Sequence, residues 1–176
     1  MRRWLADLLT GARIVAAPLL MLSLWSGETR TALLLVAVAA ATDLIDGWVA
    51  RRTNSASERG RWFDHVADII FLLAGFVALA LIGAVSAVAP AAITAAFSFY
   101  VVDSLRQSKT RSLVASRLGH MAGVMNYVVL GTVVFSLATD GTIVPSWLTT
   151  IAVGSVPLYS GAAVVARLAG PREQGS

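Results

Sequence analysis

Residues 43–51 read DLIDGWVAR and residues 60–68 read GRWFDHVAD, and these two segments decide how the rest of the chain is interpreted. Asp43 and Asp46 are three positions apart, and Asp64 and Asp68 are four positions apart. Both spacings put the two side chains on one face of an α-helix. Each segment adjoins a long apolar stretch. Ionisable side chains inside membrane-spanning helices are energetically costly, so they point to a functional site.

The composition identifies the class of protein in which these aspartates lie. Of 176 residues, 57% are hydrophobic and 14% are charged, with a mean hydropathy of +0.74. Roughly a quarter of the residues in a soluble protein are charged. We therefore expect an all-α integral membrane protein instead of a very apolar soluble one. The absence of cysteine from the sequence excludes disulfides and thiolate chemistry.

Six stretches are long and apolar enough to cross a membrane, which takes about 20 residues. They are Leu8–Trp25, Ala32–Ala50, Trp62–Val85, Ala87–Leu105, Leu118–Ala138 and Ile143–Ala166. We expect one transmembrane domain over residues 1–176, with a disordered tail at 171–176. The first residues are expected to belong to the mature protein, since Arg13 interrupts the apolar run that a signal peptide requires.

Basic residues mark alternate connections between these stretches. They are Arg2, Arg3, Arg51, Arg52, Arg59, Arg61, Arg106, Lys109, Arg111, Arg117, Arg167 and Arg172, whereas the opposite connections contain Arg30. Basic residues gather on the cytoplasmic side of membrane proteins. The pattern predicts six transmembrane helices with both termini in the cytoplasm. It also accounts for the net charge of +4 without a nucleic-acid partner.

The four aspartates are predicted to converge. Their helices are antiparallel neighbours joined by a short connection. Asp43 lies about 12 Å along its helix from Arg51, and Asp68 lies about 10 Å from Arg61. Four carboxylates in one layer repel each other unless a cation neutralises them. Oxygen ligands suit Mg²⁺ or Mn²⁺, and we expect one of these ions. Salt bridges to the neighbouring arginines are a poorer explanation for four such residues.

Small residues accompany the acids. Gly47, Ala50 and Gly60 permit close helix packing, and beside a metal they also let a ligand approach the backbone. Arg51 stands at the cytoplasmic end of the same face, where a guanidinium suits phosphate oxygens.

The two segments together resemble the signature of the CDP-alcohol phosphotransferase family, D-x₂-D-G-x₂-A-R-x₈-G-x₃-D-x₃-D, at every position. The six-helix layout is also similar. Residues 9–13, LTGAR, with Pro18 resemble the first-helix pattern of family members that make phospholipids. In those members the pattern usually opens with Pro-Asn, where this chain has Ala6-Asp7.

The resemblance implies an enzyme that transfers a phospho-alcohol group from a CDP-linked donor to a second alcohol and releases CMP. It implies a homodimer in the membrane. The CDP-linked donor is expected to be CDP-diacylglycerol, and a CDP-linked polar alcohol is the alternative that the sequence leaves open. By family pattern, metal binding falls to Asp43, Asp46, Asp64 and Asp68, and Asp68 is also the general base. The nucleotide and its diphosphate would contact Gly47, Ala50, Arg51 and Gly60.

The acceptor is expected to be a small anionic alcohol, either glycerol 3-phosphate or inositol phosphate. The basic residues Arg106, Lys109, Arg111 and Arg117 are candidates for binding it, although they also suit the topology signal and contact with anionic lipid head groups. Near the start of the fifth helix, the glycerophosphate branch would be expected to have a lysine-containing run. This chain has Leu118-Gly119-His120 instead.

A second class of function is a divalent-cation transporter or channel lined by the carboxylates. The acids form one layer near one side of the membrane, which argues against a path across it. We expect the cytoplasmic membrane of a prokaryote, with the active site facing the cytoplasm. Several roles stay open, namely those of Asp7, His65, His120 and Asn126. Asn126 and Tyr127 in the fifth helix are either polar packing residues or residues that face the cavity. For His65 a surface or interface position is favoured, and for Asp103 a pairing with Arg106 or Lys109.

Overall fold

The computed structural model describes residues 2–53, 58–107 and 117–169, and for residues 2–9, 44–53, 58–61, 107, 117, 118 and 120 it describes the backbone alone. Within these ranges every regular element is an α-helix. The helices are α1 (Arg2–Trp25), α2 (Thr29–Thr53), α3 (Glu58–Leu81), α4 (Val88–Gln107), α5 (Arg117–Ala138) and α6 (Ser146–Ala169). The prediction of an all-α protein is confirmed for these ranges, whereas the crossing of the membrane by all six helices stays a prediction.

The helix ends follow the local chemistry of the turns. Gly27, with φ of +77°, closes α1, and the N–H of Glu28 donates to the carbonyl of Ser23 at 2.8 Å. Gly83, with φ of +76°, closes α3 in the same way. Glycine is favoured at these positions because it adopts a left-handed backbone without steric strain. The third helix therefore ends at Leu81, four residues before the predicted boundary at Val85.

In the part of the chain that the structure describes, four helices are long and apolar enough to cross a membrane, over Trp62–Leu81, Val88–Arg106, Met121–Ala138 and Ser146–Ala169. Thr10–Trp25 of α1 is a shorter apolar segment. Large apolar side chains point outward along the bundle: the exposed fractions of Val15, Ile151 and Leu158 are 63%, 63% and 74%. Such exposure suits lipid, since soluble monomers rarely expose large apolar patches. The chain is a membrane protein.

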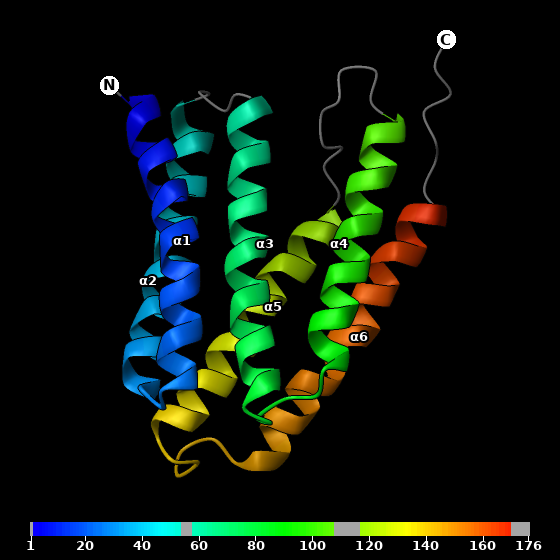
Figure 1. The fold of residues 1–176 in the computed structure, drawn as a ribbon. Helices are drawn as coiled ribbons and strands as arrows, with labels where there is room; N and C mark the ends of the chain where they lie inside the picture. Colours follow the sequence, from blue (N-terminus) through cyan, green and yellow to red (C-terminus); the bar gives the residue numbers. More distant parts are fainter. Residues whose placement is uncertain (1, 54–57, 108–116, 170–176) are drawn as a thin grey trace.

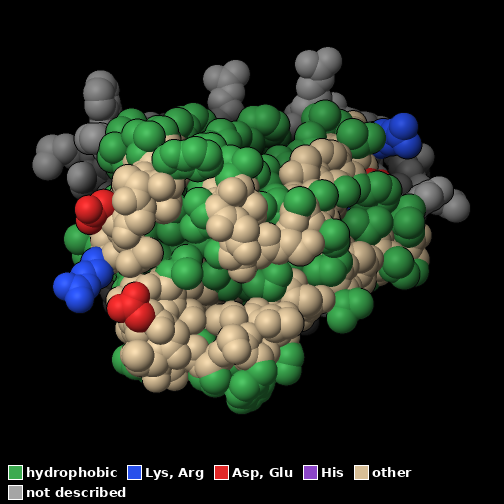
Figure 2. Space-filling view, turned by 60° about the horizontal axis from the view of Figure 1, so that its bottom comes forward, with side chains coloured by type: hydrophobic (Ala, Val, Ile, Leu, Met, Phe, Trp, Pro, Cys, Tyr) green, Lys and Arg blue, Asp and Glu red, His purple; other side chains and the backbone are tan. Residues whose placement is uncertain are grey.

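The helices run alternately up and down (Figure 1). Both chain ends lie toward the same side of the bundle, at the start of α1 and the end of α6. The helix ends that adjoin residues 54–57 and 108–116 lie toward this side as well; they are the ends of α2 and α4 and the starts of α3 and α5. Figure 2 shows the opposite end, where hydrophobic side chains dominate and charges are confined to the edges. This arrangement agrees with basic residues on alternate connections.

The core lies where α3 packs against α1 on one side and α5 on the other. Phe71, Phe76 and Leu130 are fully buried within it. Gly75 of α3 permits the close approach, because a Cβ atom there would lie 2.8 Å from Leu130 Cδ1 and 3.1 Å from Leu20 Cδ2. α1 packs against α3 more extensively than against α2, its neighbour in sequence. This packing brings polar residues of α1 to the aspartate-bearing face of α3.

Candidate active site

Three of the four predicted aspartates meet between α2 and α3. One carboxylate oxygen from each of Asp43, Asp64 and Asp68 lies within 4.8 Å of the others. The exposed fractions of these side chains are 32%, 36% and 16%, so Asp68 is the most enclosed. We call these three residues the acidic triad. Carboxylate oxygens are the ligands that Mg²⁺ and Mn²⁺ prefer, so the triad fits such an ion.

Arg13 of α1 lies at the centre of the acidic triad. Its Nη1 atom is 2.5 Å from Oδ1 of Asp68, 2.9 Å from Oδ1 of Asp64 and 3.5 Å from Oδ1 of Asp43. The Arg13 side chain is 2% exposed. Removal of one partner of a buried ion pair is strongly destabilising, because the other charge is then left buried without compensation. The described part of the site therefore contains its own positive charge.

Two hydroxyl groups also contact the triad. Thr10, one helical turn before Arg13, donates to Oδ1 of Asp64 at 3.3 Å. Tyr127 of α5 donates to Oδ1 of Asp68 at 3.0 Å. The Tyr127 ring stacks on Phe71 of α3, with ring centroids 6.2 Å apart. Asp68 is thus oriented from α1 on one side and from α5 on the other.

The remaining predicted metal- and nucleotide-binding residues belong to helices, and the structure describes only their backbone. They are Asp46, Gly47, Ala50 and Arg51 of α2 and Gly60 of α3. Their roles stay predictions. Asp46 follows Asp43 by three positions in a continuous helix, so the backbone agrees with a shared face.

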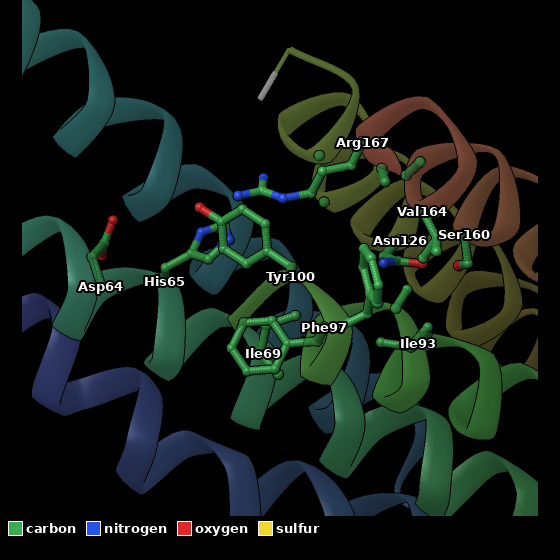
Figure 3. Close-up of a pocket in the computed structure, with 16 residues that line it drawn as sticks. Asp64, His65, Ile69, Ile93, Phe97, Tyr100, Asn126, Ser160, Val164 and Arg167 are labelled. Atoms are coloured by element: carbon green, nitrogen blue, oxygen red, sulfur yellow. The ribbon is translucent and has the colours of Figure 1, made fainter. Parts of the chain in front are cut away.

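A cavity of about 330 Å³ extends from the triad into the space between α3, α4, α5 and α6; we call it the central cavity (Figure 3). This volume lies within the range of ligand pockets, about 300–1,000 Å³. Asp64 and His65 line it at α3, and Asn126 and Arg167 line it at α5 and α6. Its walls are mainly apolar and aromatic. The hydroxyl of Tyr159 donates to Asn126 Oδ1 at 2.5 Å, which fixes the orientation of the Asn126 amide.

Arg167 provides the cation of the central cavity. Its Nε lies 2.5 Å from Oδ2 of Asp103, its Nη2 donates to Ser104 at 2.8 Å, and its guanidinium carbon lies 4.5 Å above the ring of Tyr100. Asp103 was expected to pair with Arg106 or Lys109. In the structure it pairs with Arg167, 64 residues away, whereas Lys109 lies outside the described residues. The close packing of α4 against α6 brings Arg167 to Asp103.

His65 is half-buried where α3 faces α4, and it lines the central cavity. Its ring centroid lies 5.4 Å from that of Tyr100 and 6.1 Å from that of Phe97. In Figure 3, His65 and Tyr100 lie between Asp64 and Arg167. The expectation that His65 is a surface or interface residue and not a ligand stays a prediction.

The predicted acceptor residues are only partly described. Arg106 is exposed and is not among the described residues that line the central cavity. Lys109 and Arg111 lie outside the described residues, and Arg117 begins α5 with its side chain outside the description. Their role in acceptor binding stays a prediction.

A second opening lies on the other side of the triad. This α2–α5 groove has a volume of about 480 Å³ and is almost entirely apolar; Leu33, Val36, Val128 and Phe135 are among its walls. Its polar members include Asp43 and Tyr127. Asp43 lines the groove, and Asp64 lines the central cavity. Because their oxygens lie within 4.8 Å, the triad stands at the junction of the two spaces.

Sequence reasoning missed Arg13 and Arg167 as members of these sites, and it left the place of Tyr127 open. A signal for Arg13 was present, since an arginine inside an apolar helix is a functional candidate by the same rule that singled out the aspartates. Arg167 carries no comparable signal, because an arginine at a helix end is an ordinary feature of membrane helices. Tyr127 contacts Asp68 and lines the α2–α5 groove.

Comparison with known proteins agrees with this geometry. Residues 3–163 match the family described as CDP-alcohol phosphatidyltransferase, which spans nearly the whole chain. The chain therefore belongs to the CDP-alcohol phosphatidyltransferase family, as the resemblance of residues 43–68 indicated.

Among similar proteins are two from Arabidopsis thaliana and one from Rickettsia felis. The first, CDP-diacylglycerol–glycerol-3-phosphate 3-phosphatidyltransferase 2 of Arabidopsis, is 30% identical over 125 residues, covering 67% of this chain and 53% of the relative. The chloroplastic/mitochondrial enzyme 1 of the same name from Arabidopsis is 37% identical over 79 residues, 43% of this chain and 26% of the relative. The Rickettsia felis protein of that name is 32% identical over 71 residues, 39% of each. The matches span about half or less of the length of these relatives.

Proposed function

We propose that this chain is a metal-dependent transferase that moves a phosphatidyl group from CDP-diacylglycerol to glycerol 3-phosphate and releases CMP. The main observation in favour is the acidic triad at the junction of an apolar groove and a cavity that contains an arginine. The relatives' names favour glycerol 3-phosphate over inositol phosphate as acceptor. Both termini and the active site would face the cytoplasm, in a prokaryotic cytoplasmic membrane, and the chain would act as a homodimer.

Each substrate has a place suited to its chemistry. The apolar α2–α5 groove suits an acyl chain of the lipid donor, which would bring the diphosphate to Asp43. The central cavity suits a small anionic alcohol, whose phosphate would be bound by Arg167. The acceptor hydroxyl would then lie toward Asp64 and its neighbour Asp68.

Asp43, Asp64 and Asp68, together with Asp46, would hold the Mg²⁺ or Mn²⁺ ion. When bound, that ion neutralises charge on the diphosphate and on the departing CMP. Asp68 would accept the proton of the acceptor hydroxyl while the oxygen of that hydroxyl attacks the phosphorus attached to diacylglycerol. The new P–O bond forms while the bond to CMP breaks. Thr10 and Tyr127 would keep the two carboxylates of α3 in position.

The purified protein should release CMP from CDP-diacylglycerol only when glycerol 3-phosphate is added. The measurement is CMP formation in detergent or liposomes over a panel of CDP-linked donors and alcohol acceptors. The transporter alternative would instead predict divalent-cation flux into liposomes. Cation flux without CMP formation from any donor would contradict the proposed function.

Arg167→Gln is expected to raise the KM for glycerol 3-phosphate by about tenfold to 100-fold, since a hydrogen bond to a charged group contributes about 1.5–3 kcal/mol. Affinity for the donor should change little. Arg167→Lys keeps the charge and should show a smaller increase. The measurement is steady-state CMP release at saturating donor.

The matched comparison is Arg106→Gln, which alters an exposed arginine in the same region. Should Arg106→Gln raise the acceptor KM more than Arg167→Gln does, the acceptor would be bound by the basic segment between α4 and α5. The central cavity would then not be the acceptor site.

A further inference from the structure

Arg13 has no part in the transfer proposed above, yet it is one of the most buried large side chains in the described chain. A charged side chain inside a membrane protein is energetically costly, so it points to a function. The position of its Nη1 atom indicates what that function is. The three ion-pair distances, 2.5, 2.9 and 3.5 Å, all end on the Oδ1 atoms of the triad.

Those Oδ1 atoms are available to only one central cation at a time. A magnesium ion bonds oxygen at about 2.0–2.1 Å, which is shorter than any of the Arg13 distances. An ion placed among the three oxygens would therefore overlap the position of Nη1. Two positive charges at such a separation also repel strongly in a site with little water. Arg13 and a metal ion are thus competitors for the same oxygens.

We infer that Arg13 is an exchangeable counter-ion, which holds the acidic triad together when no metal is bound and withdraws from its centre when a divalent cation binds. This inference rests on the metal-binding part of the proposed function. Without a cation the three carboxylates would repel each other and push α2 and α3 apart. With Arg13 between them, the metal-free protein keeps its site assembled.

The position of Arg13 on α1 suits this role. Thr10 lies one turn earlier on the same face and binds Asp64, so this face of α1 docks on the triad through two residues. Among the described residues, the packing of α1 against α3 is more extensive than that of any other pair of helices. The guanidinium is at the end of a long side chain with several rotatable bonds, so the proposal requires only a change of side-chain rotamer at Arg13 and no shift of α1.

Arg13→Gln should give two coupled effects that need no substrate. Binding of Mn²⁺, followed by the loss of the free-ion electron paramagnetic resonance signal, should be at least about tenfold tighter than in the unaltered protein, because the competitor is gone. The melting temperature in EDTA should fall, and Mn²⁺ should restore it, so the metal-induced rise in Tm becomes larger. Arg13→Lys, which keeps the charge, should behave between the two.

Arg30→Gln provides the control, since Arg30 is exposed at the start of α2, far along that helix from Asp43. It should leave both readouts unchanged. Weaker or unchanged Mn²⁺ binding in Arg13→Gln, or an unchanged response of Tm to metal, would overturn the role of Arg13. If Arg13→Gln cannot be purified folded, Arg13→Lys decides alone: Mn²⁺ binding no tighter than in the unaltered protein would overturn the role.

These outcomes separate this inference from the proposed function. If the unaltered protein binds Mn²⁺ and releases CMP but Arg13→Gln binds Mn²⁺ no more tightly, only the role of Arg13 fails. If neither protein binds Mn²⁺, the metal site fails and this inference fails with it.

Discussion

Asp68→Asn is expected to slow CMP release by at least about 100-fold while it leaves binding of the CDP-linked donor nearly intact. General-base catalysis typically contributes about 10²- to 10⁴-fold in rate. Asparagine keeps the shape of the side chain and still accepts a hydrogen bond from Tyr127, but it cannot take a proton from the acceptor hydroxyl. The enclosure of Asp68, with 16% of its side chain exposed, leaves it the best shielded carboxylate of the triad.

Isothermal titration of the donor in the presence of Mg²⁺, alongside CMP release, checks this prediction. Asp43→Asn is the informative comparison, because loss of a metal ligand should weaken both metal and donor binding. Asp140→Asn, on the connection before α6, is the matched control and should be silent. If Asp68→Asn loses donor binding as severely as Asp43→Asn, Asp68 acts chiefly as a metal ligand and the base is another group.

Removal of divalent cations should abolish the activity altogether. With the metal chelated by EDTA, the diphosphate of the donor would meet three carboxylates without the divalent charge that offsets them. Like charges at such distances repel strongly where water is scarce. Addition of Mg²⁺ or Mn²⁺ in excess over the chelator should restore CMP release, and Ca²⁺ should restore less because its larger shell demands more ligands.

The measurement is CMP release after EDTA treatment and dialysis, with each ion titrated back. Circular dichroism of the chelated protein is the control, since the helices should persist without metal. Full activity in a sample shown to be metal-free would contradict the metal site.

Most of the site on α2 and α3 could be predicted from the sequence, because it depends on residues that are close together in the chain. Asp43 and the pair Asp64 and Asp68 are placed by helical periodicity and by a short connection between antiparallel helices, so spacing alone predicts that they converge. The helix boundaries were predicted less well: at Gly83 the left-handed backbone ends α3 before the apolar run does. Hydropathy measures the environment of a segment and says little about where its backbone turns.

By itself, then, the sequence determined the class of protein, its all-helical fold and the convergence of acidic residues from α2 and α3. Tertiary structure alone decided what surrounds that layer. Arg13 is 55 residues from Asp68, Tyr127 is 59 residues from Asp68, and Arg167 is 64 residues from Asp103. Those pairings depend on which faces of α1, α5 and α6 pack inward. In apolar helices with weak amphipathic character, close packing of small and large side chains selects the face, and a linear pattern of residues does not record it.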